Sequence, residues 1–170
     1  LYDVADRLED NVDELAEILT TEEGKPISSS RGEVARTADM FRYFAGYARR
    51  TTGETVPSSD PETFTYTIRE PLGVVALVTP WNFPIGTPGW KLAPALATGN
   101  TVVFKPSSET PMVAKRLVEL LAAAGIPDGV VNLVVGAGST VGDALTTDDR
   151  VDGVSFTGST DVGRHIADAV

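Results

Sequence analysis

The chain has 170 residues, of which 42% are hydrophobic, so it is long enough to bury the core of one ordinary domain. It contains no cysteine, which excludes disulfides and any thiol nucleophile from this stretch, and we expect no metal site. The formal net charge of −10 argues against binding to nucleic acid, because phosphate contacts need clustered lysines and arginines.

The acidic balance and the chain ends lead to further expectations. An excess of 24 acids over 14 basic residues suits a solvated surface at high salt, and a halophilic source is one hypothesis. The apolar runs are far shorter than the roughly 20 residues of a bilayer span, and the first residues do not resemble a signal peptide, which predicts a cytoplasmic protein without membrane contact. Because the chain begins with Leu1 rather than Met and stops within a predicted helix, we expect both ends to be cut.

The first 60 residues predict a helical hairpin. Apolar residues recur at helical spacing over residues 1–23, and Gly24 and Pro26 then end that helix. The apolar face consists of Val4, Leu8, Val12, Leu15 and Leu19. Ser30 and Glu33 have the spacing of a capping box, which predicts that a second amphipathic helix begins there and continues to Ala48.

Residues 63–69 alternate between threonine or arginine and apolar side chains, which is the period of a strand. Asp60 and Pro61 mark a turn before it. We expect a short strand of a separate small sheet at this point in the chain.

From Pro71 onward, short apolar runs alternate with helical segments, each about as long as a βαβ unit requires. The predicted strands are 73–79, 101–105, 130–135 and 153–157, and the predicted helices are 89–97, 111–124 and 140–147, with a last one from Ser159. Consecutive apolar residues favour strands buried on both faces. The fold class is therefore α/β, a doubly wound, Rossmann-like parallel sheet, with an amino-terminal helical segment over 1–60 and an incomplete dinucleotide-binding domain over 61–170.

Two glycine-rich segments are candidates for phosphate binding. In residues 136–142 the third glycine falls one position late for a dinucleotide fingerprint, so these glycines could also make only a tight turn. Residues 158–163 have the glycine spacing of a P-loop, but Arg164 and His165 replace the required lysine and hydroxyl residue, which argues against a nucleotide triphosphatase. The start of the last helix could hold an anion, or Ser159 or Thr160 could simply cap it.

Two further features follow predicted strands. In residues 80–84, two prolines flank two aromatic residues and an asparagine. This segment is either a functional loop or a loop that only packs against the rest of the fold. Lys105 ends a strand, where its ammonium group could project into the ligand crevice or extend to the surface.

Residues 79–84, 90–100, 103–107 and 156–160, together with 23–26 and 53–57, make the chain similar to the aldehyde dehydrogenase superfamily. The resemblance implies an NAD(P)-dependent oxidation of an aldehyde to a carboxylic acid through a thioester on a cysteine. The family's cysteine and general-base glutamate follow the segment seen here. We therefore expect a fragment that lacks the catalytic domain and is inactive alone; the alternative is a standalone, non-catalytic nucleotide-binding or interaction module.

The resemblance also assigns roles to individual residues. Asn82 is the expected catalytic residue, as the donor to the developing oxyanion. The expected cofactor-binding residues are Thr79, Trp81, Lys105, Ser108, Gly138, Gly142, Thr157, Gly158 and Ser159, with Lys105 at the ribose and Ser159 at the pyrophosphate. Gly86 and Trp90 are similar to residues of the substrate tunnel, and Lys91 to a buried lysine near the proton-transfer route, whereas we expect His165 to be an ordinary surface residue.

Cofactor preference depends on Ser108. NAD-preferring relatives often carry a glutamate three residues after the lysine, and a serine there leaves room for a 2′-phosphate, so we expect NADP or NAD, with NADP favoured. If the alignment shifts by one residue, Glu109 takes that place and the prediction reverses.

Residues 84–91 are similar to the tunnel segment of semialdehyde-oxidising branches, especially those acting on 2-oxoglutarate semialdehyde. We expect any arginine that binds the substrate carboxylate to lie outside the chain. A small-molecule aldehyde is the expected partner, and no oligomerisation arm is evident, although the full-length protein is expected to be a homodimer or homotetramer.

Overall fold

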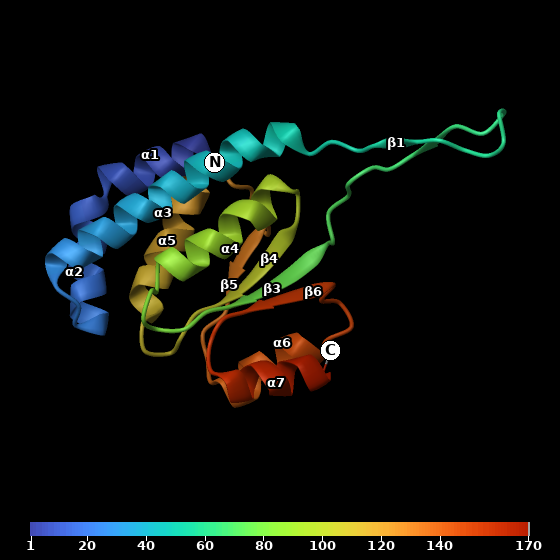
Figure 1. Cartoon of the computed structure of the whole chain (residues 1–170). Helices are drawn as coiled ribbons and strands as arrows, with labels where there is room; N and C mark the ends of the chain where they lie inside the picture. The colour runs from blue at the N-terminus through green and yellow to red at the C-terminus, as the bar shows by residue number, and fades with distance from the viewer. Residues whose placement is uncertain (170) are drawn as a thin grey trace.

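The computed structural model describes residues 1–169, which form an α/β fold with helices on both faces of a parallel sheet (Figure 1). The amino-terminal helices are α1 (Tyr2–Asp10), α2 (Val12–Glu23) and α3 (Ile27–Tyr47), followed by the short 3₁₀ helix η1 (Ala48–Arg50). Two short strands, β1 (Thr55–Val56) and β2 (Thr65–Tyr66), come next. The remaining elements are β3 (Val74–Val78), α4 (Gly86–Ala97), β4 (Thr101–Lys105), α5 (Pro111–Ala123), β5 (Val131–Leu133), η2 (Gly138–Gly142), α6 (Asp143–Thr147), β6 (Gly153–Phe156) and α7 (Thr160–Ala169).

The first predicted helix is interrupted at Asn11, so the prediction of one continuous helix over residues 1–23 was wrong. The Asn11 side-chain amide donates to the carbonyl of Arg7 at 2.8 Å, which is a local bond of the kind that competes with helix continuation. Gly24 ends α2 as predicted, in the left-handed conformation with φ of 86°.

The capping box at Ser30 and Glu33 was also wrong, because α3 begins three residues earlier at Ile27. Both residues lie within α3 rather than at its start, and both are buried. The hydroxyl groups of Ser30 and Thr20, which belongs to α2, form a hydrogen bond of 2.9 Å. Glu33 instead bonds to backbone N–H groups of another segment, as described below. The sequence spacing was correct for a cap, but tertiary packing gave both residues different partners.

The four-stranded parallel sheet has the order β5-β4-β3-β6. Each strand runs parallel to its neighbour, and the chain returns past β3 to add β6 on the other side, which makes the space between β3 and β6 the topological switch point. Helices α4 and α5 lie on one face of the sheet, and α6 and α7 on the other (Figure 1). The central strands β3 and β4 are largely buried, whereas β5 and β6 at the edges are only half-buried, contrary to the expectation that all four would be buried on both faces.

One hydrophobic cluster joins the amino-terminal helices to the sheet domain. Its buried members come from α1, α2, α3, α4, α5 and the central strands, and include Leu8, Leu15, Phe41, Leu92, Phe104 and Leu117. A polar contact supports the same interface, because both carboxylate oxygens of Glu22 accept from Met112 and Val113 at the start of α5, at 2.7 and 2.9 Å. The helices of residues 1–47 therefore cover α4 and α5 as an outer layer.

Strands β1 and β2 form the separate small sheet that the sequence predicts, paired antiparallel. They belong to a long hairpin that projects away from the rest of the molecule (Figure 1). The hairpin carries exposed apolar side chains, among them Phe64 at 74% exposure, with Tyr66 and Ile68. Residues 51–70 thus form an extended hairpin, of which the sequence analysis predicted only the strand around Tyr66.

Between β5 and β6 the chain forms a π-helical turn, η2, that continues into α6. The helix predicted from residue 140 therefore starts two residues earlier. Among the described residues, no helix combines the length and apolar character needed to cross a bilayer.

Candidate functional site

The carboxyl ends of the parallel strands bring three predicted site residues to one edge of the sheet. The Thr79 N–H, just after β3, donates to the carbonyl of Lys105 at 3.2 Å, and the Thr157 N–H, just after β6, donates to Val78 at 3.0 Å. Residues from three strands that are far apart in the sequence therefore meet at the switch point, as expected for a ligand site in this fold.

A cavity of about 370 Å³ opens at this edge, between the sheet, η2 and α7. Its walls include the predicted residues Lys105, Gly138 and Gly142, together with Val162 and His165. The other predicted cofactor residues lie outside its lining, and Thr157, Gly158 and Ser159 follow β6 at the start of α7. The glycine turn and Lys105, which are 33 to 37 residues apart, are thus brought to one cavity.

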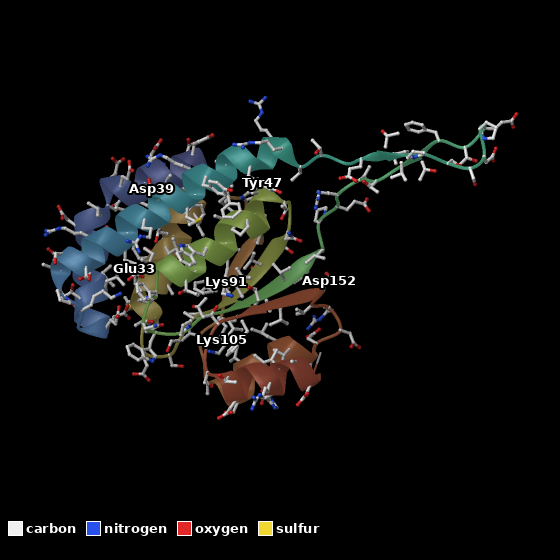
Figure 2. The ribbon with its side chains drawn as sticks, in the orientation of Figure 1. Glu33, Asp39, Tyr47, Lys91, Lys105 and Asp152 are labelled. Carbon is white, nitrogen blue, oxygen red and sulfur yellow. The ribbon has the colours of Figure 1, made fainter. Side chains whose placement is uncertain are left out.

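Lys105 is buried, with 5% of its surface exposed, so it is not the extended surface lysine of the alternative interpretation. Its ammonium group donates to the carbonyl of Pro106 at 3.0 Å, and burial holds the pKa of this lysine below its ordinary value. Figure 2 shows Lys105 at the end of the sheet near η2 and α7. A lysine with three donors and one backbone acceptor has capacity left for ligand oxygens.

The side chain of Thr79 is a second buried polar group that can form further hydrogen bonds. Its hydroxyl oxygen is fully covered and has no hydrogen-bond partner among the described residues. Buried hydroxyls are normally paired, so an unpaired one beside Lys105 is consistent with a ligand that completes its bonding. A ribose-containing dinucleotide, which carries many hydroxyl and phosphate oxygens, fits this pair of groups.

The glycines of the two candidate phosphate segments differ in how much space surrounds their Cα atoms. A Cβ on Gly136 would lie 2.5 Å from Val141, and one on Gly158 would lie 2.4 Å from the ring of Phe156, so packing alone requires both glycines. In contrast, a Cβ on Gly138 would meet nothing within 4 Å, and one on Gly142 would only reach Lys105 at 4.0 Å. Gly138 and Gly142 therefore leave open space beside Lys105.

Ser159 and Ser108 both make contacts within the chain. The Ser159 hydroxyl accepts from the Val162 N–H at 3.4 Å, which is the helix-capping role that the sequence left open. The Ser108 hydroxyl donates to the carbonyl of Gly136 at 3.2 Å, at the entrance to the glycine turn. Ser108 and Glu109 are both exposed.

The loop after β3 presents Asn82 to the surface, between Trp81 and Phe83, which are both about half exposed. The backbone carbonyl of Asn82 accepts from the ammonium group of Lys25 at 3.1 Å. The same ammonium group lies 4.6 Å from the centre of the Phe83 ring. Lys25, from the turn between α2 and α3, was not predicted as a site residue.

Glu33 of α3 contacts both Lys25 and the end of the same loop. It forms an ion pair with Lys25, and its other carboxylate oxygen accepts from the N–H groups of Ile85 and Gly86 at 3.1 and 2.9 Å. Figure 2 shows Glu33 where α3 meets the beginning of α4. No sequence signal identified this role, because the backbone partners of Glu33, Ile85 and Gly86, lie more than 50 residues away.

A groove of about 550 Å³ lies between α3 and α4. The predicted tunnel residues Gly86 and Trp90 line it, and so do Phe83 and Glu33. Arg36 of α3 also lines the groove, and among the described residues its guanidinium group takes part in no ion pair. Arg36 is therefore an arginine of this chain that lies beside the groove of the predicted tunnel residues.

The remaining predicted residues lie apart from the groove. The Lys91 ammonium group donates to the Ser155 hydroxyl at 2.7 Å, and burial lowers the pKa of Lys91. His165 is exposed as expected, although its partner is Asp143 at 3.1 Å rather than an acid of its own helix. Within residues 1–169, no group of three or more potential ligands is arranged to hold a metal ion.

Comparison with known proteins gives consistent matches over the whole chain. The sequence profile of the Aldehyde dehydrogenase family matches residues 1–170. The chain is 51% identical to 2,5-dioxopentanoate dehydrogenase from Saccharolobus solfataricus and 52% identical to alpha-ketoglutarate semialdehyde dehydrogenase from Haloferax volcanii, covering 98% and 91% of this chain. It spans about a third of those relatives, 35% and 32% of their lengths.

A solved structure shows the same arrangement. A point mutant of betaine aldehyde dehydrogenase from Staphylococcus aureus, determined in complex with NAD+, superimposes with a TM-score of 0.96 at 41% sequence identity. The match covers 99% of this chain and 34% of that structure.

Proposed function

The chain belongs to the aldehyde dehydrogenase family, and we propose on this basis that it is the NAD(P)-binding part of an enzyme that oxidises an aldehyde to a carboxylic acid. The observation that carries the proposal is the pair of buried polar groups at the strand ends, Lys105 and Thr79, with exposed Asn82 three residues beyond Thr79. The match over the whole chain does not favour a standalone, non-catalytic module.

In the proposed site each residue has a separate task. Lys105 and Thr79 bind hydroxyl groups of the cofactor, and the free N–H groups at the start of α7, near Ser159, bind its pyrophosphate. The bound NAD(P) supplies a hydride acceptor. The side-chain amide of Asn82 donates to the oxygen of the aldehyde as negative charge develops on it.

The nucleophile must come from another stretch of polypeptide, and the resemblance to the family implies the same for the general base. The 170 residues contain no cysteine, and thioester chemistry needs a thiolate. We therefore expect the isolated chain to lack turnover. Turnover is the property of a longer polypeptide that carries this chain, and the chain's span of about a third of its relatives supports this.

For the substrate, we propose an acid semialdehyde, with 2-oxoglutarate semialdehyde as the leading candidate. The names of the two similar relatives, 2,5-dioxopentanoate and alpha-ketoglutarate semialdehyde dehydrogenase, support this choice. Arg36 supports it independently, because a guanidinium group beside the groove can bind a carboxylate through two parallel hydrogen bonds. Gly86 and Trp90 would line the path of the chain that joins the carboxylate to the aldehyde.

The proposed cofactor is NADP or NAD, with NADP favoured by Ser108. Ser108 is exposed beside the glycine turn and adds no negative charge that would repel a 2′-phosphate. Isothermal titration of the longer polypeptide with each cofactor tests this preference. Tighter binding of NAD by tenfold or more would contradict our interpretation of Ser108.

The activity is tested with the purified longer polypeptide and NAD(P), by following NADPH or NADH formation at 340 nm. We expect kcat/KM to be highest for 2-oxoglutaric semialdehyde, lower for succinic semialdehyde and lowest for unsubstituted aliphatic aldehydes. No oxidation of any aldehyde would contradict the proposed reaction, whereas a preference for aliphatic aldehydes would contradict only the substrate class.

A further inference from the structure

The turn between α2 and α3 is fastened to the loop that carries Asn82. Lys25 donates to the backbone carbonyl of Asn82 at 3.1 Å, and Glu33 accepts from Ile85 and Gly86 at 3.1 and 2.9 Å. The Lys25–Glu33 ion pair joins these two attachments. Both ends of the segment 82–86 are thus held by one pair of charged side chains from a distant part of the sequence.

The contact depends on close packing of α3 against α4. A Cβ on Gly86 would lie 3.3 Å from Cγ of Glu33, and one on Gly89 would lie 2.5 Å from Thr37. Glycine at position 89 thus lets α3 approach α4 closely, and glycine at position 86 leaves room for the Glu33 side chain to reach the first N–H groups of α4. The carboxylate also lies at the positive end of that helix, which strengthens the contact.

The side chain of Asn82 has no comparable support of its own. No hydrogen bond within the described residues involves its amide group, and the residue is exposed. The direction of the amide therefore depends on the position of its backbone, which Lys25 holds at the carbonyl. The bonds of this support are charge-assisted, and the two charged side chains are 13% and 4% exposed, so they are weakly screened by solvent.

We propose that Lys25 and Glu33 are positioning residues for the oxyanion donor, and that they fix the backbone of segment 82–86 so that the Asn82 amide meets the substrate oxygen. This inference rests on the proposed function, since it assigns a task to Asn82. Misplacement of a catalytic group by about 1 Å can cost roughly a hundredfold in rate, so a modest displacement of the loop is enough to matter.

The test uses the longer polypeptide with Lys25→Met and Glu33→Gln, and Glu22→Gln as a matched control. The Glu33→Gln side chain would keep an oxygen that accepts from Ile85 and Gly86 but would lose one of the two charges that bind Lys25, the other being Glu23 at 2.9 Å. Glu22 caps α5 in the same way but has no contact with segment 82–86. We expect both test variants to lower the pre-steady-state rate of acylation by about tenfold or more, with the Kd for NAD(P) within about twofold of the wild type, and Glu22→Gln to leave acylation unchanged.

A double-mutant cycle with Asn82→Ala separates positioning from a general loss of stability. If Lys25 acts through Asn82, then Lys25→Met should change the acylation rate by less than about twofold in the Asn82→Ala background. An equal loss in both backgrounds would overturn the proposal, as would wild-type acylation in both Lys25→Met and Glu33→Gln.

Lys25→Arg provides the rescue, because a guanidinium group can donate to both Glu33 and the Asn82 carbonyl. It should recover most of the acylation rate, and if Lys25→Met does not fold, Glu33→Gln and Lys25→Arg still give the comparison. Failure of the proposed function would be distinct, because the wild-type polypeptide would then oxidise no aldehyde.

Discussion

Among single residues, the unusual feature is a set of polar side chains whose hydrogen-bonding or ion-pairing groups are not all satisfied within the chain. Lys105 and Thr79 are buried at the strand ends, whereas Arg36 is exposed and stands beside a groove without an ion-pair partner among the described residues. Buried polar groups without full hydrogen bonding cost stability, so they are retained where a ligand completes them. Two of our predictions concern these residues.

Lys105→Ala is expected to weaken NAD(P) binding about 10- to 100-fold, which is the usual effect of losing a hydrogen bond from a charged group. Calorimetry measures the Kd, and Lys115→Ala is the control, because Lys115 is an exposed lysine paired only with Glu119. Burial lowers the pKa of Lys105, so its proton is lost at a lower pH than that of an ordinary lysine at 10.5. Affinity should therefore decline as pH rises, with a midpoint below that value, and an unchanged affinity across this range would count against a cationic role.

Arg36→Ala is expected to raise KM for an acid semialdehyde by about tenfold, which corresponds to roughly 1.4 kcal/mol, and to leave KM for an aliphatic aldehyde unchanged. The reason is that only the acid substrate carries a carboxylate for the guanidinium group. Arg31→Ala is the matched control on α3, since Arg31 pairs with Asp13 of α2. A similar change in KM for both substrates would show that Arg36 does not select the carboxylate.

Among the helices and strands, glycine has opposite effects at two positions near the same turn. Gly24 ends α2 with φ of 86°, and Gly32 lies inside α3, and neither would bring an added Cβ within 4 Å of another group. Space is therefore not the difference between them. The difference is backbone conformation, which an L-residue adopts easily in the helix and poorly at the left-handed cap.

Gly24→Ala should lower the free energy of unfolding by about 1 kcal/mol, whereas Gly32→Ala should raise it by about 0.5–1 kcal/mol. Urea unfolding of the longer polypeptide, followed by far-ultraviolet circular dichroism, provides the comparison. Equal effects of the two substitutions would mean that the left-handed cap is not a constraint in solution.

In the molecule as a whole, the projecting hairpin is the part that the rest of the fold does not cover. Its apolar residues Phe64, Tyr66 and Ile68 are between 60% and 74% exposed, and paired strands with exposed edges are common sites of association. We propose that this arm packs against a second copy in the homodimer or homotetramer expected for the longer polypeptide.

Replacing Phe64, Tyr66 and Ile68 together by serine should shift the longer polypeptide to smaller assemblies, measured by sedimentation velocity. Thr65→Ser, on the opposite side of the same strand, should leave the assembly unchanged because strand side chains alternate between faces. An unaltered sedimentation coefficient in the triple variant would show that the arm is not the interface.

Local patterns along the chain were enough to predict the parallel sheet and to place the candidate site residues at the ends of its strands. The four parallel strands, the helices between them, Asn82 after the first strand and Lys105 at the end of the second follow from apolar runs, turn residues and short motifs, all of which are local along the chain. Even the small separate sheet could be predicted from the alternation around Tyr66.

The distant side chains that support that edge could be identified only in the folded chain. Glu33 has the spacing of a local helix cap, yet it binds Ile85 and Gly86, and local periodicity indicates neither the contact of Lys25 with Asn82 nor the position of Arg36 beside the groove. Hydrophobic patterns and capping signals specify an element within a few residues, whereas these contacts depend on how closely α3 packs on α4, which is set by side-chain volume at positions about 50 residues away.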